Sequence, residues 1–354
     1  MPVRIGLARA SKEMKLAGIL LSGLGLILSA STSCRRNSQT VPPDEYGSLY
    51  PVTLRLNNGT PLLEIGFSSR GVQELTTLDE PELDWIHPGA YSAWDYTEWH
   101  WWKGHPFDFR ARGFENPAYW DSFRPRFQGN PRVDAERMGK GYLGIEFETD
   151  GFTFRQDYLL PATAVRDRVY WDMIFTAANS TGRSIEEYGH FFACYTSVNG
   201  RRSHWFWDAG GELALWADRG VGHLDGYVSS PEAYFQRAGK IPHCPRGGGR
   251  LIGTWHHPVL VSRSSPAGWR SVILLDPETT AAVTCGMEGT AMDFIFYPGH
   301  KRRVFPPEDR FRSHLRHLMV KHPGLPTRDQ LEDWWSEFQR ARPDLARRLD
   351  DLGE

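Results

Sequence analysis

Cysteine is scarce in this sequence, with only four cysteines among 354 residues. Cys34 follows an N-terminal apolar segment, and the other three, Cys194, Cys244 and Cys285, show no Cys-x-x-Cys spacing. Three cysteines form at most one disulfide bond, so the sequence excludes a fold held together by a disulfide framework.

Motifs of nucleotide-binding proteins and serine hydrolases are also missing. The sequence contains no P-loop, no dinucleotide-binding glycine fingerprint and no Gly-x-Ser-x-Gly elbow. The triplet Gly247–Gly249 follows Pro245 and lacks the strand–glycine–helix setting of a phosphate loop, so it indicates a flexible loop. We therefore expect no cofactor.

Histidines occur in two close pairs, but neither pair has the spacing of metal ligands. His256 and His257 are adjacent, and His314 and His317 are three residues apart. If these residues lie in strands, the members of each pair point to opposite faces, because successive side chains alternate across a sheet. No cysteine or carboxylate stands at a familiar zinc spacing beside them. We expect no metal site of this kind, and the sequence leaves open a Ca²⁺ ion held by loop carboxylates.

Only one apolar run approaches the length of a membrane span, and it lies at the N-terminus. The 15 residues Leu16–Ala30 follow four basic residues and precede the small residues Ser31–Ser33. This order predicts a secretory signal peptide over residues 1–33. Cys34 then stands where the bacterial lipobox has its lipidated cysteine, although Ser31 replaces the usual Leu. Lipidation of Cys34 and ordinary cleavage both stay open, and either predicts an exported protein of the periplasm or the cell surface.

The charge balance argues against nucleic acid as a partner. The chain has 41 basic and 43 acidic residues, and removal of residues 1–33 takes away four basic residues and Glu13. The remaining 37 basic and 42 acidic residues give a net charge of −5. Nucleic-acid binding requires a positive surface, so we expect none. Contact with a membrane is expected only through a lipid on Cys34, and the oligomeric state stays open.

The body of the chain has the pattern of short strands. Residues 34–50 are polar and contain proline, as in a linker, and residues 51–322 alternate short β-type runs with turns rich in Gly and Pro. The predicted strands are 52–56, 62–67, 143–148, 152–155, 169–175, 190–196, 204–208, 212–216, 251–262, 271–275, 281–285, 292–297 and 310–320. The pattern predicts an all-β fold, a large antiparallel β-sandwich.

One helix is predicted, in the C-terminal segment 323–354. Thr327 and Gln330 form a capping box, and Leu331, Trp334, Trp335 and Phe338 fall on one helical face. We expect Pro343 to end this helix, with a polar tail after it.

Aromatic residues are abundant, with 14 Trp, 19 Phe and 13 Tyr, and they concentrate between residues 85 and 127. We predict an irregular binding loop here, because a sugar ring stacks on aromatic faces while its hydroxyl groups bond to polar side chains. The predicted substrate-binding residues are Trp94, Asp95, Glu98, Trp99, His100, Trp101, Trp102, His105 and Arg110. The alternative is that these rings cover the sheet as part of the core.

A second pattern lies between residues 179 and 192. The strand that ends at Asn179 is followed by a short turn, Ser180–Arg183, and then by His190 before two phenylalanines. Here the chain resembles the galactose mutarotase-like family of β-supersandwich proteins. Residues 53–67 resemble the family's opening hairpin, and Phe305–Asp309 resembles its closing segment.

This resemblance implies a supersandwich-like fold and an acid–base reaction on a sugar. In the sugar epimerases of the family, the equivalent of His190 protonates the ring oxygen while a carboxylate removes the anomeric proton. We predict His190 as the acid, and Glu288, with Asp293 as the second choice, as the base. The chain departs from the family in lacking an Asn-Arg pair with a following His for holding sugar hydroxyls.

Two functions stay open at this point. The first is an exported carbohydrate-active enzyme, an epimerase, hydrolase or lyase, with a carbohydrate ligand in an aromatic-lined cleft. For a hydrolase, Asp95, Glu98 and Asp108 are candidates for two facing carboxylates about 5–10 Å apart. The second is a carbohydrate-binding surface lipoprotein without catalysis.

Overall fold

The structure is a computed structural model of the whole chain. The described residues all belong to the unit Ser38–Glu354. They are residues 50–68, 71–85, 97–102, 132–149, 152–161, 164, 167–184, 189–194, 204–216, 225–228, 250–285, 292–296 and 305–353. In this part of the chain, no helix is long and apolar enough to cross a membrane.

A small antiparallel sheet opens the chain. Its strands are β1 (Tyr50–Arg55), β2 (Pro61–Ser68), β3 (Gly71–Thr77) and β4 (Glu80–Asp84), paired in sequence order. The turn between β1 and β2 places Gly59 at a φ of 81°, a left-handed conformation that glycine adopts without steric strain. The predicted opening hairpin is therefore present.

A large sheet of 14 strands follows. Its main path runs β5-β10-β17-β16-β13-β14-β15-β18-β9-β8-β7-β6, and β11 joins β14 and β12 off this path. All its strand pairs are antiparallel except β13 with β14. The bounds are β5 (Thr97–Trp102), β6 (Arg132–Asp134), β7 (Tyr142–Thr149), β8 (Phe152–Leu159), β9 (Arg168–Asn179), β10 (Gly189–Cys194), β11 (His204–Asp208), β12 (Leu213–Trp216), β13 (Asp225–Val228), β14 (Arg250–Ser262), β15 (Trp269–Leu275), β16 (Thr280–Cys285), β17 (Met292–Phe296) and β18 (Arg310–Lys321).

The core lies between the two sheets. Alternate residues of β9, such as Trp171 and Phe175, share one buried cluster with Ile65 and Phe67 of β2. The rings of Phe67 and Tyr158 on β8 meet edge to face, with centroids 4.8 Å apart. The predicted large antiparallel β-sandwich is confirmed, because side chains from the facing sides of the two sheets form one buried cluster.

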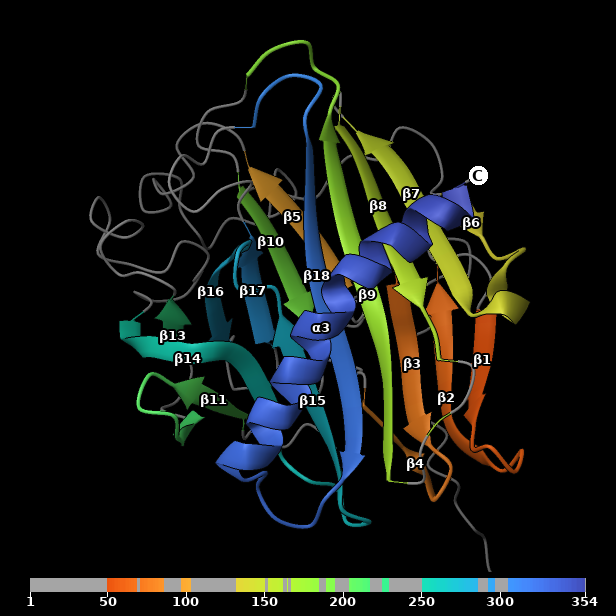
Figure 1. The fold of residues 1–354 in the computed structure, drawn as a ribbon, viewed down its shortest axis with the longest axis vertical. Coiled ribbons are helices and arrows are strands. Elements are labelled where there is room, and N and C mark those ends of the chain that lie inside the picture. The colour runs from red at the N-terminus through yellow and green to blue at the C-terminus, as the bar shows by residue number, and fades with distance from the viewer. Residues whose placement is uncertain are drawn as a thin grey trace, which may run out of the picture. The chain divides into compact units, whose positions relative to one another are not determined.

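The opposite face of the large sheet is covered by helix α3 (Arg328–Gly353), which crosses β15, β18 and β9 (Figure 1). The capping box is confirmed: Thr327 Oγ1 accepts from the Gln330 N–H at 3.3 Å, and Gln330 Oε1 accepts from the Thr327 N–H at 2.9 Å. A 3₁₀ turn, Met138–Lys140, completes the regular elements among the described residues.

The prediction that Pro343 ends the helix is wrong, because α3 continues ten residues beyond it. A proline inside a helix costs about 3 kcal/mol through its missing hydrogen bond and its ring clash. The two turns that follow bury Leu345 and Leu349 against Leu159 and Ile174 of the sheet. Burial of two leucines contributes roughly 3–6 kcal/mol, which offsets that cost.

The prediction of an irregular segment between residues 85 and 127 is also wrong in part. Residues Thr97–Trp102 form strand β5 at one end of the main path of the large sheet. Tryptophan and threonine fit a pleated, half-buried surface well, which accounts for the strand.

Candidate functional site

The predicted acid, His190, and three of the predicted sugar-stacking tryptophans, Trp99, Trp101 and Trp102, lie on neighbouring strands. Strand β10 pairs with β5 in a continuous antiparallel register, with His190 opposite Trp101 and Phe192 opposite Trp99. On its other side, β10 pairs with β17, where His190 is opposite Phe296. Segments about 90 residues apart in the sequence are thus brought side by side (Figure 1).

The register also divides the candidate residues between the two faces of these strands. Residues directly opposite each other in an antiparallel ladder occupy the same face, and the next pair occupies the other face. His190 shares its face with Trp99 and Trp101. Glu98 and Asp293 are both opposite Ala193, one on each side, so they share the other face.

This division bears on the choice of base. Asp293, the second choice from the sequence, occupies the face away from His190, and so does Glu98. His100, which is opposite Phe191, belongs to the face of Glu98, and Trp102, which is opposite Gly189, does so too. The roles of all these residues stay predictions.

Several predicted site residues lie outside the described residues. They are Cys34, Trp94, Asp95, His105, Asp108, Arg110 and Glu288. Glu288 belongs to the segment 286–291, which joins β16 to β17. The strands at both ends of that segment pair with each other, Cys285 opposite Met292.

Asn179, which begins the family-like pattern, is a structural junction. Its side chain is buried, and its Nδ2 group donates to the carbonyl oxygens of Arg183 at 3.0 Å, Phe305 at 2.9 Å and Pro306 at 2.8 Å. Its Oδ1 atom accepts from the Thr181 N–H at 3.0 Å. One side chain therefore fixes the turn before β10 and joins it to the segment before β18, a role that the sequence did not indicate.

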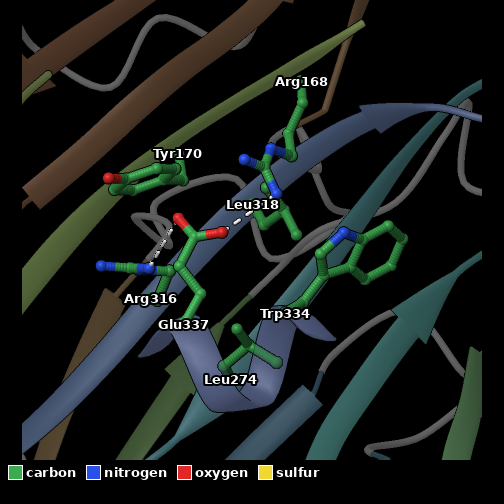
Figure 2. Close-up of a pocket in the computed structure, with 7 residues that line it drawn as sticks. All are labelled: Arg168, Tyr170, Leu274, Arg316, Leu318, Trp334 and Glu337. Atoms are coloured by element: carbon green, nitrogen blue, oxygen red, sulfur yellow. Dashed lines mark hydrogen bonds and ion pairs between the residues drawn. The ribbon is translucent and has the colours of Figure 1, made fainter. Parts of the chain in front are cut away.

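A hollow between α3 and the sheet combines three charged residues with aromatic and aliphatic ones (Figure 2). Its lining is Arg168, Tyr170, Leu274, Arg316, Leu318, Trp334 and Glu337. Glu337 of α3 contacts Arg168 at 3.0 Å and Arg316 at 3.5 Å, and the Arg316 guanidinium lies 4.0 Å from the centre of the Tyr170 ring. Arg316 also donates two hydrogen bonds to Asp172, at 2.8 and 2.9 Å. The hollow has almost no enclosed volume, and these ion pairs attach the helix to the sheet.

His314 and His317 lie on opposite faces of β18, as the alternation predicts. His317 is fully buried in the inter-sheet core, with its ring 4.2 Å from Trp171 and its Nε2 atom 2.7 Å from Ser271 Oγ. Burial lowers the pKa of His317 to about 3. Burial, together with the charges of Arg342 and Arg312, lowers the pKa of His314 to about 4. Both imidazoles are neutral at pH 7 and belong to the packed structure.

The expectation that His256 and His257 point to opposite faces is wrong. Both imidazole Nε2 atoms approach the same carboxylate: His256 lies 3.0 Å from Glu332 Oε1, and His257 lies 3.7 Å from Glu332 Oε2. The cause is an irregularity in β14, since Phe206 of β11 pairs with Leu260 and Asp208 with Trp255. Four residues of β14 therefore stand against one residue of β11, and strict alternation is lost.

No family model and no curated protein matches the chain. Similar proteins are found only among solved structures. One solved structure is a galactose mutarotase related enzyme from Lactobacillus acidophilus, at 9% identity over 78% of this chain and 100% of that chain, with a TM-score of 0.42. An aldose 1-epimerase candidate from Escherichia coli K12 shows 10% identity over 77% of this chain and 100% of that one, with a TM-score of 0.42. A galactose mutarotase-like protein from Clostridium acetobutylicum shows 8% identity, coverages of 77% and 99%, and a TM-score of 0.34.

Proposed function

We propose that this protein is a carbohydrate-active enzyme that binds a sugar over strands β5, β10 and β17. The observation that supports this most directly is the register that pairs His190 with Trp101 and places Trp99 on the same face. A tryptophan ring binds the apolar face of a sugar, and histidine is the side chain whose unperturbed pKa, about 6.5, suits proton exchange near neutral pH.

The reaction that we propose is epimerisation at the anomeric carbon of an aldose. His190 donates a proton to the ring oxygen while a carboxylate takes the proton of the anomeric hydroxyl, so the ring opens and can close with either configuration. The sequence resemblance favours this reaction. Hydrolysis needs a pair of carboxylates across the sugar, and on these three strands Glu98 and Asp293 occupy the face away from His190.

We propose Glu288 as the base. Its segment, 286–291, joins β16 to β17, and β17 pairs with the strand that carries His190. On β5, β10 and β17, the face of His190 carries no carboxylate. A base on the segment that connects two strands is consistent with this.

The test is the rate at which an anomerically pure aldose reaches equilibrium, followed by polarimetry for a panel of sugars. We expect His190→Ala to lower kcat about 10²–10⁴-fold, the usual contribution of one general acid, with little change in binding. His322→Ala, a histidine of the loop before α3, is the matched control and should leave the rate unchanged. Trp101→Ala should weaken binding roughly tenfold, and Trp101→Phe should weaken it less, because an aromatic face is kept.

The outcomes separate the proposal from its alternatives. Sugar binding that needs Trp101 but shows no turnover with any aldose would identify a carbohydrate-binding protein without catalysis. Full activity in His190→Ala would refute the assignment of the acid, and full binding in Trp101→Ala would refute the assignment of the sugar-binding face.

We also propose that the protein acts outside the cytoplasm, in the periplasm or at the cell surface. The proposal rests on the signal-like sequence of residues 1–33 and on Cys34 after it. Mass spectrometry of the mature N-terminus tests it: a diacylated or triacylated Cys34 supports a lipid anchor, an unmodified cleaved terminus supports a free exported protein, and retention of residues 1–33 refutes export by this route.

A further inference from the structure

We propose that His256, His257 and Glu332 bind a divalent transition-metal ion of the Zn²⁺ type, which fastens helix α3 to strand β14. Each residue offers one ligand atom, and the three atoms lie within 4.8 Å of one another. The group is separate from the β5–β10 strands and is the one such group of three that the described ranges contain.

The distances suit a metal ion of this size. Zinc bonds of about 2.0–2.2 Å at tetrahedral angles place the ligand atoms roughly 3.3 Å apart. Glu332 offers one oxygen at 3.0 Å from His256 Nε2 and the other at 3.7 Å from His257 Nε2. Small rotations of the three side chains therefore bring the ligands to bonding distance of one ion.

The backbone of β14 holds the two histidines in this arrangement. In the irregularity between Trp255 and Leu260, four residues of β14 lie opposite a single residue of β11, Trp207. Pro258 directly follows the two histidines and has no N–H group to donate to a ladder, which favours an irregularity at this point. On the helix side, Glu332 and Trp335 are three residues apart and share one face of α3.

Two tryptophans enclose the histidines. The Trp335 ring stacks on His257, with centroids 4.4 Å apart and an interplanar angle of 10°. The buried Trp207 ring lies 4.9 Å from the His256 ring and 5.1 Å from the His257 ring. These contacts restrict both imidazoles, so less ordering is required when an ion binds.

The charges are also compatible with a cation. Glu332 brings a negative charge, and Arg328, 4.0 Å from Glu332 Oε1, is the cation that a metal ion would displace from it.

The ligand set leaves room for a further ligand. Two imidazoles and one carboxylate supply three bonds, and their side chains are 28%, 28% and 37% exposed. Zinc sites with three protein ligands take water as the fourth. Nitrogen and oxygen donors with partial exposure therefore favour Zn²⁺ over a softer ion that prefers thiolates.

The test is titration of the purified full chain, stripped with a chelator, with ZnCl₂ by isothermal calorimetry. We expect one saturable site, and a melting temperature that rises when Zn²⁺ is present. Glu332→Gln keeps the shape of the side chain but removes its charge, and His257→Gln removes one imidazole. Each should weaken Zn²⁺ binding at least tenfold and abolish the rise in melting temperature, whereas the control His322→Gln should change neither.

Two results would overturn the proposal. The first is the absence of a saturable site in the wild-type chain. The second is an unchanged Zn²⁺ affinity in His257→Gln and Glu332→Gln, which would assign the binding to other histidines. Should one of these variants fail to fold, as judged by circular dichroism, the other decides the question. Loss of sugar turnover plays no part in this test, so it stands apart from the proposed function.

Discussion

The buried ion pair between Asp172 and Arg316 offers a quantitative test of how α3 is attached. The two residues are register partners on β9 and β18, and their side chains are 4% and 3% exposed. Two hydrogen bonds of 2.8 and 2.9 Å join them, and Glu337 of α3 lies 3.5 Å from the same guanidinium. The perturbation is Asp172→Asn, which keeps the volume and removes the charge.

We expect Asp172→Asn to lower the free energy of unfolding by about 3 kcal/mol. Removal of one partner from a buried pair costs roughly 3–5 kcal/mol, because the remaining charge is left without compensation in the protein interior. The value should lie at the lower end, since Arg316 keeps Glu337 and its contact with the Tyr170 ring.

A double-mutant cycle isolates the pair. Replacement of both partners, Asp172→Leu with Arg316→Met, removes both buried charges and should cost well below the sum of the two single changes. The matched control is the exposed pair between Arg312 of β18 and Asp350 of α3, whose side chains are 37% and 63% exposed. Asp350→Asn should change stability by less than about 1 kcal/mol.

The assay is urea unfolding followed by tryptophan fluorescence, with the transition midpoint and slope compared among the variants. Two results would refute the argument that this pair stabilises the fold because its charges are buried. One is a loss in the free energy of unfolding below about 1 kcal/mol in Asp172→Asn, and the other is a loss in the double variant equal to the sum of the losses in the two single variants.

Three further predictions concern other residues of the fold. In the folded protein the pKa values of His317 and His314 are about 3 and 4, below the value of 6.5 expected in the unfolded chain. The unfolded chain therefore binds protons at these histidines more tightly than the folded chain does, and the free energy of unfolding should fall as pH drops from 6.5 toward 4. His317→Gln should reduce this fall in the free energy of unfolding, measured by urea titration at each pH, by roughly 3 kcal/mol. An unchanged pH dependence would contradict the low pKa of His317. Asn179→Ala should lower the melting temperature, with a loss of about 2–4 kcal/mol, because buried carbonyl groups lose their donor; a loss below about 0.5 kcal/mol would argue against the junction. Gly141→Ala should destabilise the fold by more than about 2 kcal/mol, since φ is 79° and a Cβ would lie 2.6 Å from the Leu160 carbonyl oxygen; near-wild-type thermal unfolding would refute this.

The sequence predicts the features of this fold that depend on near neighbours. The β-branched and aromatic residues of Val169–Phe175 predict a strand, which lies within β9, because such side chains fit a pleated, packed surface. Thr327 and Gln330 likewise predict the start of α3, since a capping box needs only residues three apart. The fold class and the single long C-terminal helix are therefore readable from local patterns.

Patterns among neighbouring residues predict the candidate sugar site only in part. The tryptophan density of one segment and His190 in the other are local features of the sequence. The pairing of the two segments in one register joins residues about 90 positions apart. The face that each residue occupies depends on that register, because a shift of one residue exchanges the two faces. The placement of Glu98 and Asp293 away from His190 could therefore not be predicted.

The sequence by itself determined that this chain builds stacked antiparallel sheets with one capped helix, because those properties follow from the periodicity of neighbouring residues. The tertiary structure alone decided that α3 continues through Pro343, since the burial of Leu345 and Leu349 offsets the cost of the proline. It also decided that His256 and His257 meet Glu332, because that contact needs both an irregular strand and a helix about 75 residues further along the chain. Local periodicity describes a regular strand and contains no information about where pairing between distant strands makes it irregular.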